Sequence, residues 1–330
     1  MSEKIKKIEE TQKTVEPEDL NFERIMLDAE AMDAARPEMN AIDTQKAQDM
    51  KEKFNSKINM VDAKLGKLVE YSLYTVSDEW LDAKAKGYTV RTGRSSEFDD
   101  FVNGIDILVG VEGADGKVAQ FAIDTTWNKG KVTEKIQKQT NFRGGLPKGM
   151  TFLKYPNTAV TPGVTRMQEI PRFVTGLEKE NAADFVHDVY AQEKNLRLPQ
   201  AEQAYLLSVK NNTLEEMSLQ AMGMKRAAEN DPKTTDEMMK QITEIAKYLR
   251  FALAKNILEI EEYNERPSTD MPAGGISDDM HASIMKETSA YYGIPRDTAR
   301  QMAEKQAEKI KEARGTKIGK KTMGAAELNN

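Results

Sequence analysis

The stretch IDILVGVEGADGKVAQFAIDTTW, residues 105–127, decides the fold. Two of its segments, Ile105–Val111 and Val118–Trp127, are rich in the β-branched and aromatic residues that favour strands. Between them lies Asp115-Gly116, a dipeptide that adopts the positive φ angles of a tight hairpin turn. The stretch therefore predicts an antiparallel β-hairpin at the centre of the chain.

Two aspartates occupy matching positions on this hairpin. With the turn at Asp115-Gly116, residue 106 is expected to pair near residue 125, so Asp106 and Asp124 lie at the same end. Neighbouring strands are about 4.8 Å apart, so two carboxylates there can hold one divalent cation. A shared cation also lowers the cost of burying either carboxylate among apolar residues. The hairpin therefore predicts a paired-carboxylate site, provided that both side chains face the same way.

The flanking segments alternate between helical and strand-like patterns. Apolar residues recur at three- and four-residue spacing over 44–74, which predicts a helix, and Ser77-Asp78-Glu79 is typical of the start of another. Pro171 is expected at the start of a strand or on an edge strand. The remaining patterns predict a short strand at 88–91, a helix at 131–140, strands at 150–155 and 170–177, and a helix at 178–192.

The amino-acid composition limits the kinds of catalytic and metal-binding site that the chain can form. The chain has no cysteine, which excludes disulfides, zinc–thiolate sites and thiol nucleophiles. It has two histidines, which argues against a histidine-rich metal site and leaves a hard cation held by carboxylates. The net charge is −6, so any surface that binds phosphate must be local.

The arrangement resembles the PD-(D/E)xK nuclease superfamily, whose restriction-endonuclease-like α/β core is a helix, a three-stranded meander, a helix and a strand. Asn103-Gly104-Ile105-Asp106 stands for the first motif of the family and Ile123-Asp124-Thr125-Thr126 for the second. The resemblance implies that Asp106 and Asp124 bind Mg²⁺ or Mn²⁺, with the Thr125 carbonyl as a further ligand. It also makes Asp100 an additional ligand or a group that supports the ligands.

The same resemblance implies the reaction. A metal-bound water of lowered pKa would attack a phosphodiester bond of nucleic acid, with DNA the expected substrate. Thr126 occupies the position of the motif lysine, and some families carry that lysine on the next helix. Lys131 and Lys135 are one helical turn apart there, so either is a candidate for the catalytic lysine. An acid on the helix before the meander is also common, and Glu70 and Glu79 both remain open.

The boundaries follow from these patterns. Residues 1–44 are expected to be a loosely ordered N-terminal arm, 45–195 the nuclease-like α/β domain and 196–264 a helical extension. Residues 265–330 are expected to hold a linker, a helical hairpin and a basic disordered tail. The chain has no run of about 18 apolar residues, and its charged N-terminus lacks the apolar core of a secretory signal. We therefore expect no membrane partner and a cytoplasmic location.

Two other functions stay open. The α/β unit could be an inactive scaffold of an interaction or structural protein, with the helices at 199–262 as a partner surface. Alternatively, residues 281–303 resemble a helix-turn-helix, in which Arg296 and Arg300 would face nucleic acid in an adaptor protein. Asp297 as the cap of a long solvated helix explains the same letters and is preferred.

Overall fold

The computed structural model describes residues 13–14, 22–33, 35–56, 60–82, 87–116, 118–138, 146–162, 164, 166–264 and 278–326. Its helices and strands, in chain order, are β1 (Lys13–Thr14), α2 (Phe22–Asp33), α3 (Ala41–Asn55), α4 (Met60–Trp80), β2 (Thr89–Arg94), α5 (Glu97–Asn103), β3 (Ile107–Glu112), β4 (Val118–Thr126), α6 (Lys129–Lys138), β5 (Met150–Leu153), β6 (Gln168–Gly176), α7 (Lys179–Glu193), β7 (Leu196–Arg197), α8 (Gln200–Ala228), α9 (Asp236–Asn264), α10 (Asp278–Tyr292) and α11 (Thr298–Ala326).

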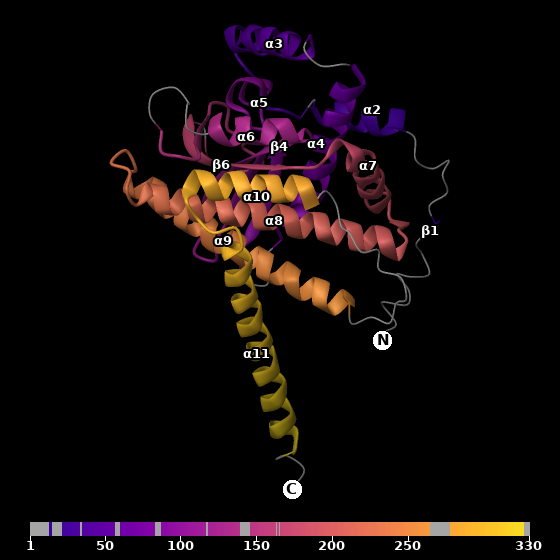
Figure 1. Ribbon diagram of the computed structural model, residues 1–330, viewed down its shortest axis with the longest axis vertical. Helices are drawn as coiled ribbons and strands as arrows, with labels where there is room; N and C mark the ends of the chain where they lie inside the picture. The colour runs from indigo at the N-terminus through magenta and orange to yellow at the C-terminus, as the bar shows by residue number, and fades with distance from the viewer. Residues whose placement is uncertain are drawn as a thin grey trace.

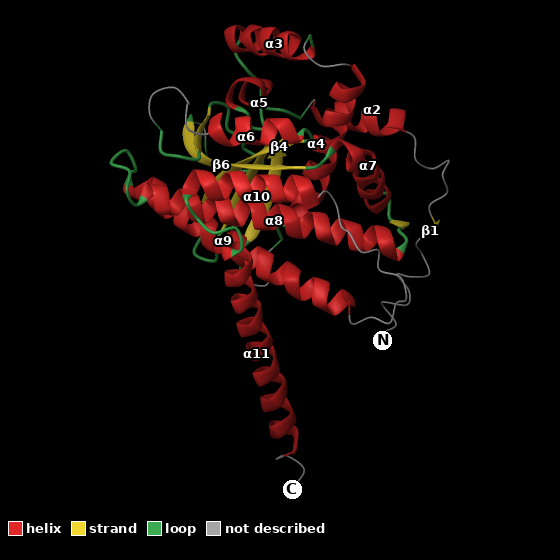
Figure 2. Cartoon of the chain, in the orientation of Figure 1, coloured by secondary structure: helices red, strands yellow, loops and turns green. Residues whose placement is uncertain are grey.

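Five strands form one mixed sheet in the order β2-β3-β4-β6-β5. Figure 2 shows the strands in yellow, with β4 and β6 of this sheet labelled. The first three form an antiparallel meander, and β4 and β6 run parallel, joined by a connection that contains α6. β5 pairs antiparallel with β6, and the two-residue strands β1 and β7 pair separately. The structure confirms the predicted hairpin and the mixed α/β class with a helical C-terminal half.

The two faces of the meander are both covered. Ile107 and Ile123 point into the main core, to which α4, α7, α8 and α9 also contribute. Leu108 and Ala122 point the other way, into a smaller apolar cluster. Burial on both faces explains why β3 and β4 read as nearly unbroken apolar runs rather than as an alternating pattern.

The β6 strand changes neighbours along its length. Up to Pro171 it pairs with β5, and its pairing with β4 begins at Arg172. The Arg172 N–H donates to the Gly149 carbonyl on the β5 side. The backbone nitrogen of Pro171, the preceding residue, therefore points to the opposite side, where β4 is not yet paired and no N–H is needed. Beyond β5, the Gln220 amide of α8 takes over: it donates to the Val174 carbonyl (2.6 Å) and accepts from the Val174 N–H (2.8 Å). Pro171 thus lies at a local edge of an interior strand.

The helices before the sheet differ from the predictions in their boundaries. The pattern over residues 44–74 spans two helices, α3 and α4. Ser77 does not begin a helix, because it lies inside α4, where its hydroxyl donates to the Leu73 carbonyl one turn earlier. A serine that bonds its own helix in this way is tolerated in a helix interior, so its cap-like sequence was misleading.

Both ends of the chain carry more helix than the sequence predicted. Within the predicted arm, Ile25 and Ala29 of α2 are buried in the main core, and Asn40 caps the start of α3. At the other end, α11 is helical to Ala326, where a disordered tail was expected. The predicted linker, residues 266–275 within the segment 265–330, lies outside the described residues.

The C-terminal helices pack on the sheet and on one another. Helices α8, α9 and α10 lie across the sheet, and α11 packs on α9 and then projects away from the body (Figure 1). Arg314 of α11 pairs with Glu262 of α9 (3.2 Å). Arg300, one of the two candidate nucleic-acid contacts, pairs with Glu215 (3.1 Å) and Glu304 (2.9 Å). In the described part of the chain, no helix is long and apolar enough to cross a bilayer.

A buried ionic cluster joins α10 to α8. The two ring nitrogens of His281 lie 3.2 Å from Glu215 and 3.1 Å from Glu216. Burial of the ring opposes protonation, but the hydrogen bonds and charges of the two carboxylates outweigh it and raise the pKa of His281 to about 9. His281 is therefore an imidazolium at neutral pH, which holds α10 on α8.

This cluster predicts a pH-dependent stability. Because the pKa of His281 is raised, its contribution is complete below the ordinary value of 6.5 and is lost as the pH rises through about 9. We expect His281→Gln to lower the free energy of unfolding by about 2 kcal/mol more at pH 6 than at pH 10. Urea unfolding at both pH values measures this difference. The matched control is His187→Gln, since His187 is 37% exposed and contacts one carboxylate; an equal pH dependence in both variants would contradict the assignment.

Candidate metal centre

The register of the hairpin differs by one position from the predicted one. Ile107 pairs with Ile123, whereas the predicted turn placed residue 106 near residue 125. Asp106 lies just before β3, and its N–H donates to the Ile123 carbonyl (3.0 Å), so Asp106 stands at the end of the hairpin where Asp124 lies. Both are buried. Asp106 Oδ2 accepts hydrogen bonds from the backbone N–H and the hydroxyl of Thr125, each at 2.6 Å.

Helix α5 brings a third carboxylate to this end of the sheet. Ser96 caps the helix, and Asp99 is occupied by the backbone N–H groups of Lys154 (2.8 Å) and Tyr155 (2.9 Å). This geometry leaves Asp100, on the next position of the helix, to face the sheet. Asp99 is therefore a structural residue and Asp100 belongs to the site.

Gly104 ends α5 and makes room for the site. Its φ of +66° is the left-handed conformation that closes many helices at a glycine. A Cβ atom there would stand 2.6 Å from Arg172 Nη1 and 3.4 Å from Asp124 Oδ2. The glycine of the Asn103-Gly104-Ile105-Asp106 motif thus lets a buried arginine lie beside Asp124.

Glu70 of α4 completes a cluster of three carboxylates. One oxygen each from Glu70, Asp100 and Asp106 lies within 4.8 Å of the others. Among the described residues, this is the group of three acidic side chains close enough together to hold one metal ion. Glu79, the other candidate on the preceding helix, accepts a hydrogen bond from Gln192 instead (2.9 Å). The structure therefore separates the two glutamates that the sequence left open.

Crowding of these acids shifts their protonation. Burial raises the pKa of Glu70 to about 8, and the neighbouring charges of Asp106 and Asp100 add to the effect. Burial likewise raises the pKa of Asp100 to about 6, against the opposing charge of Arg36. Three carboxylate oxygens held this close form a hard-ligand set that fits Mg²⁺ or Mn²⁺, because the charge of the cation offsets their repulsion.

Two arginines that the sequence did not single out border this cluster. Arg36, in the segment between α2 and α3, donates to Asp100 Oδ2 at 2.9 Å. Arg94, at the end of β2, lies 3.2 Å from Glu70. Both also pair with Asp33, at 3.0 and 3.7 Å respectively. The acid cluster is thus partly neutralised by the chain itself.

Of the two candidate lysines on α6, one reaches the end of β4. Lys135 Nζ donates to Asp124 Oδ1 and to the Thr125 carbonyl. Burial opposes its protonation, but the charges of Asp124 and Asp106 outweigh burial and raise the pKa of Lys135 above its ordinary value. Lys131 does not reach the site: its side chain is 55% exposed and pairs with Glu134 (2.9 Å).

Asp124 and Thr125, which were expected to bind the metal, contact Lys135. Glu70, Asp100 and Asp106 form the acid cluster beside them, and the predicted metal-binding role of Asp124 and Thr125 stays a prediction. The second Asp124 oxygen lies 3.6 Å from Arg172. Burial raises the pKa of Asp124, although Lys135 and Arg172 oppose the shift.

Arg172 fixes this half of the site in place. Its guanidinium donates to the Asn103 carbonyl (3.1 Å) and to the Lys135 carbonyl (2.8 Å). It therefore ties the end of α5, the middle of α6 and Asp124 together. A charged residue within the otherwise apolar segment IPRFVTGL (170–177) was a signal from which it could have been found.

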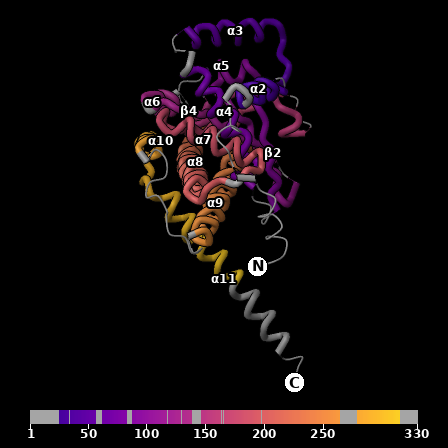
Figure 3. The backbone as a smooth tube through the Cα atoms, turned by 90° about the vertical axis from the view of Figure 1, so that its right-hand side faces the viewer, coloured from indigo at the N-terminus to yellow at the C-terminus, as the bar shows by residue number. Residues whose placement is uncertain are grey.

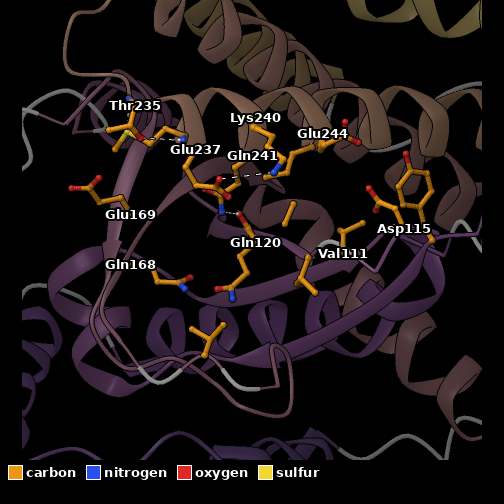
Figure 4. Close-up of a pocket in the computed structure, with 17 residues that line it drawn as sticks. Val111, Asp115, Gln120, Gln168, Glu169, Thr235, Glu237, Lys240, Gln241 and Glu244 are labelled. Atoms are coloured by element: carbon orange, nitrogen blue, oxygen red, sulfur yellow. Dashed lines mark hydrogen bonds and ion pairs between the residues drawn. The ribbon is translucent and has the colours of Figure 1, made fainter.

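A cavity of about 530 Å³ lies at the other end of β4, where β4 and β6 have not yet paired. Gln241 of α9 reaches into this opening and donates to the Gln120 carbonyl (3.0 Å), as Figure 4 shows. The cavity is lined by carboxylates that stand apart around its rim: Asp115, Glu169, Glu237 and Glu244. None of the predicted site residues lines it.

Comparison of the chain with protein-family models, with curated proteins and with solved structures finds no match. The interpretation of the site therefore depends on its own geometry.

Proposed function

We propose that this protein is a metal-dependent nuclease with a PD-(D/E)xK-type site, which hydrolyses phosphodiester bonds of nucleic acid. The observation that carries the proposal is the position of Lys135, on Asp124 and the Thr125 carbonyl and beside the three-carboxylate cluster. That position is the one the family gives to its motif lysine, which Thr126 does not supply here. The meander, the crossover through α6 and the parallel β6 support a restriction-endonuclease-like core.

Each side chain then has a role. Glu70, Asp100 and Asp106 would hold Mg²⁺ or Mn²⁺, which when bound supplies a water of lowered pKa and neutralises charge on the phosphate. Lys135, which is protonated, stabilises negative charge that develops on the phosphate oxygens. Asp124 positions the ammonium group of Lys135. The proposed substrate is nucleic acid, DNA first, and the proposed location is the cytoplasm. A protein partner would bind the outward side of the helices over 199–262.

A second candidate is an inactive scaffold with the same fold. It is favoured by one observation: Arg36 and Arg94 already pair with two of the three carboxylates. In that case the cluster is a buried ion-pair network, which binds no cation and cleaves nothing.

Cation binding and cleavage together test the proposal. We expect Mn²⁺ at about 100 times its dissociation constant to raise the free energy of unfolding by about 2.7 kcal/mol relative to protein in a chelator. Linear duplex DNA, single-stranded DNA and RNA are then incubated with Mg²⁺ or Mn²⁺. Asp106→Asn is expected to lose the stabilisation and the cleavage.

The matched control is Asp115→Asn, which removes an aspartate at the other end of the same hairpin. It is expected to keep both properties. Wild-type protein that shows neither cation-dependent stabilisation nor cleavage would leave the scaffold as the better description. Cleavage that persists in Asp106→Asn would place the active site elsewhere.

A further inference from the structure

The segment 35–55, called the strap here, contains Arg36 and helix α3 and is attached to α5. Met39 Sδ accepts from the Phe98 N–H (3.2 Å), and Lys51 pairs with Glu97 (2.8 Å). Arg36 Nη1 contacts Asp100 Oδ2 (2.9 Å) as well as the Ser95 carbonyl (3.3 Å). The strap therefore binds the short helix that carries one of the three candidate metal ligands.

A second attachment crosses to the segment after β5. Lys154 Nζ lies 2.6 Å from Asp43, and the Tyr155 hydroxyl donates to the same carboxylate. Asn40 Nδ2 donates to the Tyr155 hydroxyl (2.8 Å). The strap thus spans from α5 to residues 154–155. Figures 1 and 3 show α3 at the extremity of the molecule, beyond α5.

Arg36 supplies the charge that a bound cation would supply. Its side chain is 9% exposed, and it lies within hydrogen-bonding distance of Asp100, a member of the carboxylate cluster. Arg36 and a divalent cation both neutralise Asp100. Each is therefore expected to weaken the binding of the other, and thermodynamic linkage makes that effect reciprocal.

The strap is held mainly by polar contacts. On α3 the buried residues are Asp43 and Ala47, whereas Ile42 is 81% exposed and Phe54 is 50% exposed. Release of α3 also breaks the edge-to-face contact between Phe54 and Phe101 of α5 (6.4 Å), but few apolar side chains of α3 itself are buried. A segment with few buried apolar residues of its own is typical of one that opens locally.

We propose that the strap is an autoinhibitory segment, which keeps Arg36 on the carboxylate cluster and leaves it when a divalent cation binds. The inference rests on the proposed function, because it concerns the same metal centre. Docking of the strap and loading of the metal are then two alternative states of one site. A partner that binds the strap would activate the enzyme by raising its affinity for the cation.

Direct binding of Mn²⁺, measured by calorimetry, tests the strap without any need for substrate. Arg36→Gln removes the charge and keeps most of the length, and we expect it to bind Mn²⁺ about 10-fold more tightly than wild type, within the usual range of coupling between sites. The matched control is Arg91→Gln, which removes the same charge from an exposed pair with Glu112 in the meander and is expected to leave the affinity unchanged. Circular dichroism checks that each variant is folded.

Limited trypsin digestion gives a second, independent measurement. Mn²⁺ is expected to accelerate cleavage of the wild-type strap at Lys46, Lys51 and Lys53. Lys51→Gln, which weakens the strap without touching Asp100, is expected to bind Mn²⁺ more tightly than wild type, by a smaller factor than Arg36→Gln.

Different results would contradict the strap proposal and the nuclease proposal. Equal Mn²⁺ affinities in wild type and Arg36→Gln, or protection of the strap by Mn²⁺, would overturn the strap and leave the nuclease proposal standing. Absence of Mn²⁺ binding in wild type and both strap variants would overturn both.

Discussion

Replacing Lys135 by glutamine is expected to lower the rate of phosphodiester cleavage by about 100- to 1,000-fold, the usual effect of losing one group that stabilises transition-state charge. In the structure Lys135 is the cation that contacts both Asp124 and the Thr125 carbonyl. Glutamine can keep a hydrogen bond but carries no charge. The loss is therefore expected in kcat, without a loss of Mn²⁺ affinity. Lys135 is not one of the three clustered carboxylates, and its positive charge, which acts on Asp106 and Glu70, opposes the binding of a cation.

Lys131→Gln is the control for this variant, since it removes the same charge one helical turn earlier. Lys131 is exposed and pairs with Glu134, so its rate is expected to stay within about twofold of wild type, as for most exposed ion pairs. Single-turnover cleavage of one labelled DNA substrate, with folding checked by circular dichroism, compares the two. Equal losses in both variants would mean that α6 contributes through its surface charge, and Lys135 would lose its catalytic role.

Replacing Arg172 by methionine is expected to destabilise the protein by about 3–5 kcal/mol, the range seen when one partner of a buried ion pair is removed. The Arg172 side chain is almost fully buried, and it donates to the Asn103 and Lys135 carbonyls beside Asp124. Methionine fills much of the volume but leaves both carbonyls without this donor. Urea denaturation measures the change in the free energy of unfolding.

Arg91→Met provides the comparison on the same sheet. Arg91 pairs with Glu112 at 2.9 Å, but both side chains are more than one-third exposed, so the expected cost is below about 1 kcal/mol. If the two variants lose similar stability, then Arg172 behaves as a surface residue and cannot be the anchor of α6. Residual cleavage by Arg172→Met is also expected to fall, because Lys135 loses the bond that holds its helix turn.

The hairpin could be predicted from the sequence because its register depends on local chemistry. The turn at Asp115-Gly116 fixes which residues face each other, so the predicted register lies within one position of the observed one, in which Ile107 pairs with Ile123. The helix-start prediction at Ser77 failed for the opposite reason. Serine followed by two acidic residues can cap a helix or lie inside one, and here the packing of α4 places Ser77 in the helix interior.

The counter-charges of the site could not be predicted in this way. Arg36 meets Asp100 from 64 positions away, and Arg94 meets Glu70 from 24 positions away. Neither pair has a spacing or a motif that marks it, since the fold alone brings the partners together. For the same reason the sequence could name Lys131 and Lys135 as equals, and only the orientation of α6 assigns them different surroundings.

The Gln220 side chain makes the α/β half of the molecule dependent on the C-terminal helical half. Its amide completes the backbone hydrogen bonding of β6 where β5 has ended, so a helix of the C-terminal half acts as the missing neighbour of a central strand. One turn away, Glu216 of the same helix accepts the Thr175 hydroxyl (2.5 Å). A chain cut after α7 would leave β6 open to pairing with another molecule, as exposed strand edges are. The α/β core is therefore not expected to be stable by itself, because α8 of the helical half covers the exposed backbone of β6.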